Sequence, residues 1–128
     1  MDFMKFKDEV IFTGRVSDQD LNSLMGAALA NVYVSTFEGF GIPIIEAFQS
    51  GIPVITSNVT SMPEIAGNAA LIVDPYKPEQ ISEAMIRLAS ASELRNELIV
   101  KGHERASIFT WQQSADLLWE SVLKTVQG

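Results

Sequence analysis

Two carboxylates flank a short glycine-rich stretch in the first half of the chain. Glu38 comes just before Gly39-Phe40-Gly41, and Glu46 lies eight positions after Glu38. The β-branched and aromatic run Val32-Tyr33-Val34 predicts a buried strand before them. Pro43 suits the first position of a helix, so we expect a helix that opens just after Gly41. The free N–H groups and positive dipole end of such a helix form an anion site, typically for phosphate.

The two acidic side chains narrow the class of ligand. Carboxylates beside a phosphate would repel it unless they face the hydroxyl-bearing parts of the same ligand. A nucleotide-sugar, which has phosphates between two polyol groups, meets this condition. In the alternative interpretation, Glu46 only favours its helix N-terminus and Glu38 is a solvated acid in a turn. The glycines and Pro43 are independent of that alternative and favour the binding site.

The segment Glu38-Gly-Phe-Gly-Ile-Pro-Ile-Ile-Glu46 resembles the E-x7-E motif of the retaining glycosyltransferases called group 1 or family 4. Many unlike residues at matching spacings carry the same resemblance, among them Ser35, Ala47, Gly51, Pro53-Val54, Pro63-Glu64 and 67–75. The resemblance covers nearly the whole chain, from Val10 to the C-terminal helix that contains the tryptophans. It is therefore more specific than an isolated pair of glutamates.

The resemblance implies a role for each candidate residue. Glu46 would hydrogen-bond the ribose hydroxyls of the donor and Glu38 would address its sugar, so these two are the catalytic candidates. Amides around Phe40, Gly41 and Ile42 would meet the diphosphate and stabilise the leaving group by charge, without a nucleophile. The other donor-binding candidates are Gly14, Arg15, Gly39, Pro43 and Glu64. For Arg15 the alternative is an ordinary solvent-facing arginine, and for Glu64 it is a capping residue. No metal or cofactor is implied.

Four short apolar runs predict strands, at 10–13, 31–35, 54–57 and 71–73. Helical patterns separate them, so the predicted class is α/β, a Rossmann-like three-layer parallel sheet of about four strands with flanking helices. The resemblance implies a single domain over 1–128, the latter part of the C-terminal donor-binding domain of a GT-B enzyme. In that family the sheet order is 3-2-1-4-5-6. Two strands that this chain lacks would lie between the runs at 10–13 and 31–35.

The predicted helices have apolar faces at helical spacing. After a capping box at Ser17–Asp20, a predicted core face is formed by Leu21, Leu24, Met25 and Ala28. Capping-box spacing at 61–64 predicts a very short helix that ends at Gly67. Pro78 opens a helix with a stripe of Ile81, Ala84, Met85 and Leu88, and a following helix from Ser92 should end near Gly102. His103, just after that glycine, would be solvated or would cap the helix.

The last predicted helix begins with a capping box at Thr110–Gln113. Its apolar stripe comprises Trp111, Ala115, Leu118, Trp119 and Val122. The resemblance implies that this helix packs against a partner domain. The alternative is packing against the core of the same domain.

The composition excludes several classes of protein. The formal net charge of −7 argues against nucleic acid or an anionic membrane as the main partner. No apolar run reaches membrane-spanning length and no signal peptide opens the chain. The absence of cysteine excludes disulfides and fits a cytoplasmic protein. We expect the full-length enzyme to be peripheral at the inner face of the membrane. A single histidine and scattered acids provide no metal-ligand spacing.

The function implied by the resemblance is the donor-binding part of a retaining glycosyltransferase, which transfers a hexose from a nucleotide-diphosphate sugar to an acceptor. The chain has no room for the acceptor-binding N-terminal domain, and the family's basic pair for the diphosphate is not visible. We therefore expect it to be inactive alone and to need that domain or a partner chain. A homo-oligomer formed by a sheet edge or strand exchange is also expected.

Two other functions compete with this interpretation. One is a non-catalytic nucleotide- or sugar-binding module, or a subunit that completes the active site of another chain. The other is a Rossmann oxidoreductase, which is opposed by the lack of G-x-G-x-x-G after the first predicted strand.

Overall fold

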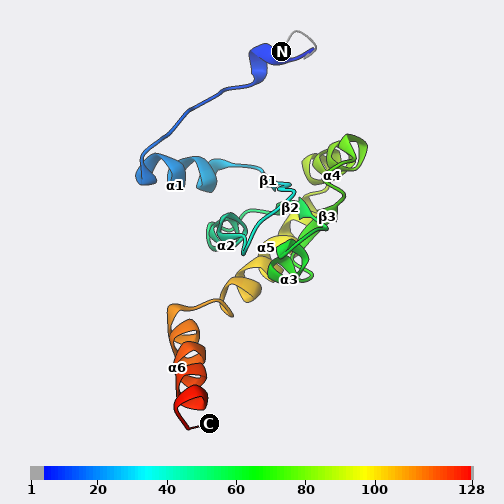
Figure 1. The fold of residues 1–128 in the computed structure, drawn as a ribbon. Coiled ribbons are helices and arrows are strands. Elements are labelled where there is room, and N and C mark those ends of the chain that lie inside the picture. Colours follow the sequence, from blue (N-terminus) through cyan, green and yellow to red (C-terminus); the bar gives the residue numbers. More distant parts are fainter. Residues whose placement is uncertain (1–4, 128) are drawn as a thin grey trace.

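The computed structural model describes residues 5–127, and its centre is a three-stranded parallel sheet with helices on both faces (Figure 1). In chain order the elements are a 3-10 turn at Lys7–Glu9, α1 (Asp18–Ala27), β1 (Asn31–Tyr33), α2 (Ile42–Gln49), β2 (Val54–Ser57), α3 (Met62–Ala66), β3 (Ala70–Val73), α4 (Pro78–Ser90), α5 (Ser92–Ala106) and α6 (Trp111–Gln127). The strand order is β1-β2-β3, with Val32 opposite Ile55 and Ile55 opposite Leu71. The predicted α/β class with flanking helices is confirmed.

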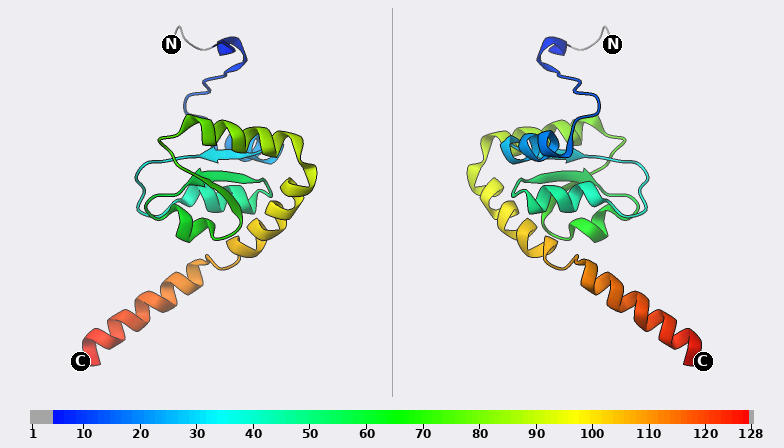
Figure 2. Two further views of the ribbon diagram at one scale, coloured as in Figure 1. Left: turned by 90° about the vertical axis from the view of Figure 1, so that its right-hand side faces the viewer. Right: turned by 90° about the vertical axis from the view of Figure 1, so that its left-hand side faces the viewer.

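The run Val10–Thr13 is not a strand, which corrects the prediction of a fourth one. It is extended and pairs with no strand among residues 5–127 (Figures 1 and 2). Ile11 is 84% and Phe12 73% exposed. A strand is stable only with a neighbour to share its hydrogen bonds. The sheet ends at β1, and the chain does not supply the strands that the resemblance places between this run and β1.

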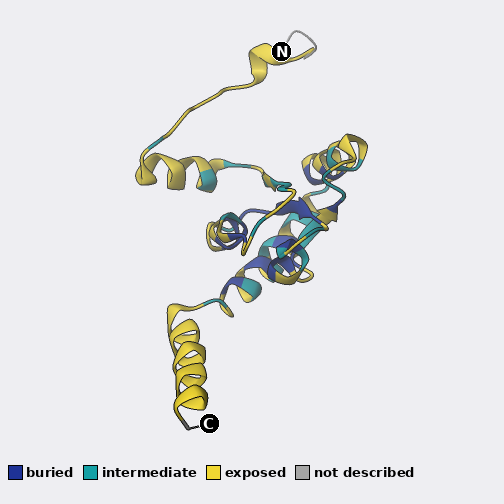
Figure 3. Ribbon diagram, viewed as in Figure 1, coloured by how far each residue is buried: buried dark blue, intermediate teal, exposed yellow. Residues whose placement is uncertain are grey.

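Two apolar clusters on the two faces of the sheet hold the fold together. One joins α2, α3 and the start of β2, through residues that include Ile44, Phe48, Val54, Met62 and Ile65. The other joins Ile55 and Val73 of the sheet to Ala84 and Leu88 of α4 and Leu98 of α5. The last turn of α5 also contributes Ala106 to the first cluster. Helix α5 therefore ties both layers together, and the buried residues gather around β2 (Figure 3).

Helix α1 forms where the sequence predicts it, but only part of its predicted core face packs against the core. Its N-cap is confirmed, since the Ser17 hydroxyl accepts from the Asp20 amide. However, Leu21 is 42% and Leu24 50% exposed, and no residue of α1 is fully buried. Met25 and Ala28 pack against the cluster around Phe48. The outer part of the face is uncovered because the sheet has no strand beyond β1 for it to pack on.

Helix α6 projects away from the rest of the molecule (Figures 1 and 2). Its predicted N-cap is confirmed, because the Thr110 hydroxyl accepts from the Gln113 amide at 3.1 Å. Its apolar stripe is exposed, with Trp111 at 92%. The alternative that this helix packs on the core of its own domain is therefore wrong. Among residues 5–127, no helix combines the length and the apolar character needed to cross a bilayer.

Gly102 lies inside α5, which runs on to Ala106 instead of ending near this glycine. A Cβ at this position would come within 2.8 Å of the Phe48 ring, so the glycine permits the close contact between α5 and α2. The glycine that predicts a helix end is therefore explained by packing, because only glycine fits against the Phe48 ring. His103 is consequently an exposed residue within α5.

We expect Gly102→Ala to destabilise the fold by about 1–3 kcal/mol, because the methyl group would overpack the Phe48 contact. Urea unfolding measured by circular dichroism tests this. Gly26→Ala in α1 is the matched control, since a Cβ there meets nothing within 4 Å. The control should leave stability unchanged or raise it by up to about 1 kcal/mol. Equal effects of the two substitutions would contradict the packing role.

Candidate functional site

The loop between β1 and α2 contains the glycine-rich stretch, and α2 begins at Ile42, directly after Gly41, as the sequence predicts. Pro43 is the second residue of the helix rather than the first. Gly41 has φ 112°, and a Cβ there would lie 3.1 Å from the methyl group of Met62. Both the backbone conformation and the close approach of α3 therefore require glycine at this position.

A row of backbone amides is free at the start of α2. Within residues 5–127, the N–H groups of Gly39, Phe40, Gly41 and Ile42 donate no hydrogen bond to another residue. Three of these four residues are exposed, and Gly41 is buried. Unpartnered N–H groups at the positive end of a helix attract an anion. These amides are therefore available to an anion, and the anion site itself stays a prediction.

Side-chain hydroxyls from β2 and the following loop fix the conformation of the glycine loop. Ser61 Oγ donates to the carbonyls of Glu38, at 3.0 Å, and of Phe40, at 2.8 Å. Ser57 Oγ donates to the Ser35 carbonyl at 2.6 Å. The capping role predicted at 61–64 is wrong, because the Ser61 side chain makes no cap hydrogen bond with α3. Sequence reasoning missed both serines; for Ser57, the available signal was its position at the end of a buried strand.

Glu38 is half-buried, and its carboxylate is held from within the chain. The Tyr33 hydroxyl donates to Glu38 Oε1 at 2.5 Å, and Ser35 Oγ lies 3.3 Å from the same oxygen. The hydrogen bond to Glu38, with smaller effects of burial and of the carboxylate charge, raises the pKa of Tyr33 to about 12. No pattern in the sequence predicts this contact, since Tyr33 has the character of an ordinary strand residue.

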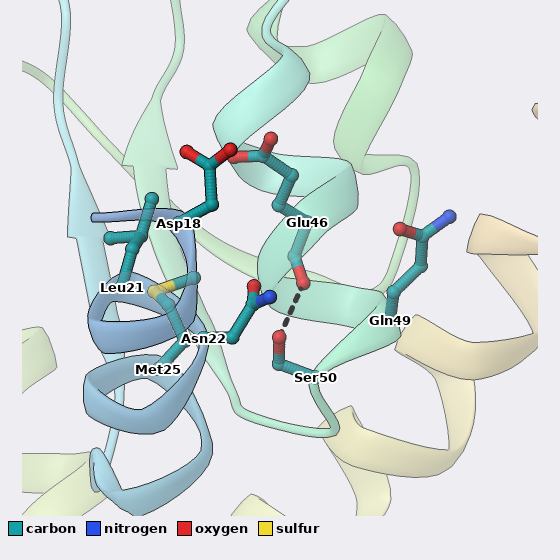
Figure 4. Close-up of a pocket in the computed structure, with 7 residues that line it drawn as sticks. All are labelled: Asp18, Leu21, Asn22, Met25, Glu46, Gln49 and Ser50. Atoms are coloured by element: carbon teal, nitrogen blue, oxygen red, sulfur yellow. Dashed lines mark hydrogen bonds between the residues drawn. The ribbon is translucent and has the colours of Figure 1, made fainter.

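Glu46 is exposed on α2 and borders a cavity of about 330 Å³ between α1 and α2. The lining is mostly polar and consists of Asp18, Leu21, Asn22, Met25, Glu46, Gln49 and Ser50 (Figure 4). The carboxylates of Asp18 and Glu46 point toward the same end of this cavity, and Asn22 adds an amide. The cavity therefore offers several hydrogen-bond acceptors, together with amide donors, to a hydroxylated ligand.

Glu46 also borders a larger cavity, of about 550 Å³, on the other side of α2. Its lining includes Phe40 and Ile42 of the anion site together with Phe109, Thr110 and Trp111. Glu38 lines neither of these two cavities. The structure therefore brings Glu46 together with part of the glycine loop, and holds Glu38 separately at the end of β1.

Gly14, Arg15 and Glu64 are not brought to either cavity. Gly14 lies in the exposed segment before α1, with φ +62° and open space around it. Arg15 is exposed and makes no salt bridge with another residue of the range 5–127. The Glu64 side chain is exposed, and its backbone carbonyl accepts from the Arg105 guanidinium. Their roles as donor ligands remain predictions.

Arg105 and Phe109 brace the loop from the end of α5. The Arg105 Nε donates to the Ile65 carbonyl at 3.0 Å, and its guanidinium lies 5.2 Å from the centre of the Phe109 ring. The Phe109 ring in turn meets Phe40 edge-to-face at 5.8 Å. This aromatic contact joins the glycine loop to the layer of α3 and α5. Sequence analysis did not identify either residue.

The described residues contain no group of three or more histidine, cysteine, aspartate or glutamate side chains arranged to hold a metal ion. The expectation that the chemistry needs no metal stays a prediction.

The chain belongs to the family described as glycosyl transferases group 1, whose model matches residues 2–105. The predicted resemblance to the group 1 glycosyltransferases is therefore confirmed at the level of the family. Relatives of this chain occur in several bacteria.

An O-antigen chain mannosyltransferase B of Escherichia coli is 41% identical to this chain over 101 residues, which are 79% of this chain and 26% of that protein. A mannosylfructose-phosphate synthase of Agrobacterium fabrum is 36% identical over 125 residues, which are 95% of this chain and 27% of that protein. The crystal structure of WaaG, a glycosyltransferase involved in lipopolysaccharide biosynthesis, superposes with a TM-score of 0.66 at 26% identity, and covers 83% of this chain and 30% of WaaG. The chain thus spans about a quarter of the length of these relatives.

We expect Ser57→Ala to lower the free energy of unfolding by about 1–2 kcal/mol, because it removes a buried hydrogen bond and leaves the Ser35 carbonyl without its partner. Urea unfolding provides the measurement. Ser90→Ala is the matched control, since the exposed Ser90 hydroxyl bonds only to carbonyls of its own helix, α4, and its effect should stay within about 0.5 kcal/mol. A Ser57 variant as stable as the control would show that this hydroxyl does not hold the loop.

Proposed function

We propose that this chain is the donor-binding part of a retaining glycosyltransferase that transfers a hexose from a nucleotide-diphosphate sugar. The observation that carries the proposal is the row of free amides from Gly39 to Ile42, with a carboxylate on either side in the sequence. Free N–H groups suit the diphosphate, and carboxylates suit hydroxyl groups. A nucleotide-sugar has both kinds of group in the required order.

The diphosphate would lie against the start of α2. Neutral N–H groups and the helix dipole would stabilise the negative charge that develops on the leaving phosphate. In this mechanism the protein supplies no nucleophile and no metal ion, and the anomeric configuration is retained.

Glu46 would accept hydrogen bonds from the ribose, and Glu38 from the sugar. The polar cavity beside Glu46 supports the first assignment, since its lining provides acceptors and amide donors for hydroxyl groups. The names of several relatives, which include mannosyltransferases, favour mannose among the hexoses. Gly14, Arg15 and Glu64 remain candidates for further donor contacts, and Pro43 helps to shape the loop.

We also propose that the chain on its own has no glycosyltransferase activity. The chain spans about a quarter of related transferases, so the acceptor site would come from an N-terminal domain or from a partner chain. A cytoplasmic location belongs to the same proposal and is supported by the composition without cysteine. The proposal also places the full-length enzyme at the inner face of the membrane, as a peripheral protein. Sugar transfer by the purified chain would contradict this expected lack of activity.

In an intact enzyme of the family, replacing the glutamate that corresponds to Glu46 by alanine should weaken donor binding by about tenfold or more. The reason is the loss of a charge-assisted hydrogen bond to ribose, which is worth about 1.5–3 kcal/mol. Calorimetric titration with GDP-mannose and GDP provides the measurement, both for that enzyme and for Glu46→Ala in this chain. Gln112→Ala, at an exposed position of α6, is the control.

The outcome also separates the proposal from the non-catalytic alternative. If the variant of the intact enzyme bound the donor as tightly as the parent enzyme, Glu46 would not contact the donor. Its role would then be limited to stabilising the N-terminal part of its helix. Tight binding of GDP by this chain, with no preference for GDP-sugars, would favour a nucleotide-binding module instead.

We also propose that the isolated chain associates through the open edge of β1. An apolar groove of about 360 Å³ adjoins this edge, and its lining includes Val32, Ile55 and Met85. The exposed, extended run Val10–Thr13 of a second copy has the apolar, β-branched character suited to pair there.

Sedimentation velocity at micromolar concentrations should therefore show a dimer or larger species. Phe12→Lys should shift it toward monomer, because a buried charge would oppose pairing. Trp119→Lys in α6 is the comparison and should leave the association unchanged. A monomeric parent chain would contradict the proposal. If only Trp119→Lys produced monomers, the contact between copies would lie on α6 and not at the edge of β1.

A further inference from the structure

Tyr33 occupies a rigid position at the end of β1, next to the glycine loop. It pairs with Thr56 across the sheet, and the Thr56 hydroxyl donates to its carbonyl at 2.8 Å. The ring packs against the cluster formed by Phe48 and its neighbours. With backbone and ring both fixed, the phenolic oxygen has a defined place relative to the loop.

Glu38, in contrast, belongs to a loop and has a side chain with three rotatable bonds. Its Oε1 receives the hydrogen bond from Tyr33 at 2.5 Å and has Ser35 Oγ at 3.3 Å. Among the described residues none donates to Oε2. One oxygen is therefore held by the protein, and the other has no donor among the described residues.

We propose that Tyr33 is a positioning residue that fixes the Glu38 carboxylate so that Oε2 accepts a hydroxyl of the donor sugar. This inference rests on the proposed function and adds to it the residue that orients the sugar-facing acid. Fixing the carboxylate before binding removes the entropy loss that a mobile glutamate would suffer on contact with the sugar. Tyr33 thus acts through Glu38 and does not touch the ligand.

The protonation state of Tyr33 suits this role and provides a readout. The neutral phenol donates the hydrogen bond, whereas phenolate could not donate and would repel the carboxylate. The pKa of Tyr33 is raised from its ordinary value of 10.0 to about 12. The contact therefore contributes fully below pH 10.0 and is lost as the pH rises through about 12. Glu38 is the charged group that faces the hydroxyl, and the neighbours Ser35 and Thr56 are uncharged.

The contact itself can be tested without any ligand. The chain has two tyrosines, so Tyr76→Phe leaves Tyr33 as the only phenol. In this background the ultraviolet absorbance of phenolate should report a pKa of about 12, with circular dichroism showing that the chain is folded over the same range. Adding Glu38→Gln should bring the pKa of Tyr33 down toward 10.0. An unchanged value would overturn the proposal, whatever the ligand binding shows.

Ligand binding then tests the positioning role, with GDP-mannose and GDP as probes. The ratio of their affinities isolates the contribution of the sugar. Tyr33→Phe should lower this ratio by about three- to tenfold, Glu38→Gln by at least as much, and the double variant by no more than Glu38→Gln alone. The affinity for GDP should be the same in all three variants and in the parent chain.

The outcomes separate the failure of this inference from that of the proposed function. A ratio lowered by Glu38→Gln but not by Tyr33→Phe would overturn the positioning role and leave the donor site in place. A parent chain that does not bind GDP, or a ratio that Glu38→Gln leaves unchanged, would overturn the proposed role of the site and the positioning role with it. The alkaline titration would then still show whether the contact exists.

Discussion

The complete burial of β2 is the constraint on which the rest of the structure depends. All four of its residues are buried, yet the strand has two chemically different halves. Val54 and Ile55 belong to the apolar clusters on the two faces of the sheet. Thr56 and Ser57 carry hydroxyls, which avoid the penalty of burial by donating to the carbonyls of Tyr33 and Ser35. The same strand therefore supplies the core and fixes the chain segment that leads into the glycine loop.

The two glutamates of the motif consequently differ in freedom. Glu38 is half-buried, with one oxygen bound to the phenol at the end of β1. Glu46 projects from the exposed side of α2 between two cavities. A fixed carboxylate discriminates between ligand geometries, because a misplaced hydroxyl finds no acceptor, whereas a free one adapts to the ligand. Under the proposed function, Glu38 would select the sugar and Glu46 would contribute mainly to the affinity for the nucleotide.

The features that could be predicted from the sequence are those determined by neighbouring residues. The β-branched runs at β1, β2 and β3 and the start of α2 after Gly41 depend on local backbone preferences. Val10–Thr13 has the same local pattern, but pairing depends on a neighbour that the sequence pattern cannot supply. Gly102 was misinterpreted because its reason is the ring of Phe48, more than fifty residues away. The Tyr33–Glu38 contact likewise arises only when the loop folds back over the end of its own strand.

The conformation of the glycine loop does not depend on the parts of the chain that lack a packing surface. The segment before α1 and helix α6 extend from opposite ends of the body (Figure 2), whereas the glycine loop is held by β2, α3 and the end of α5. The hydroxyls of Ser57 and Ser61 and the ring of Phe109 all come from this central body. A domain or partner that covers α6 or the edge of β1 would therefore add surface around the loop without having to shape it. Under the proposed function, this chain would hold the donor-binding part of the site, and a partner would add the surface that faces it.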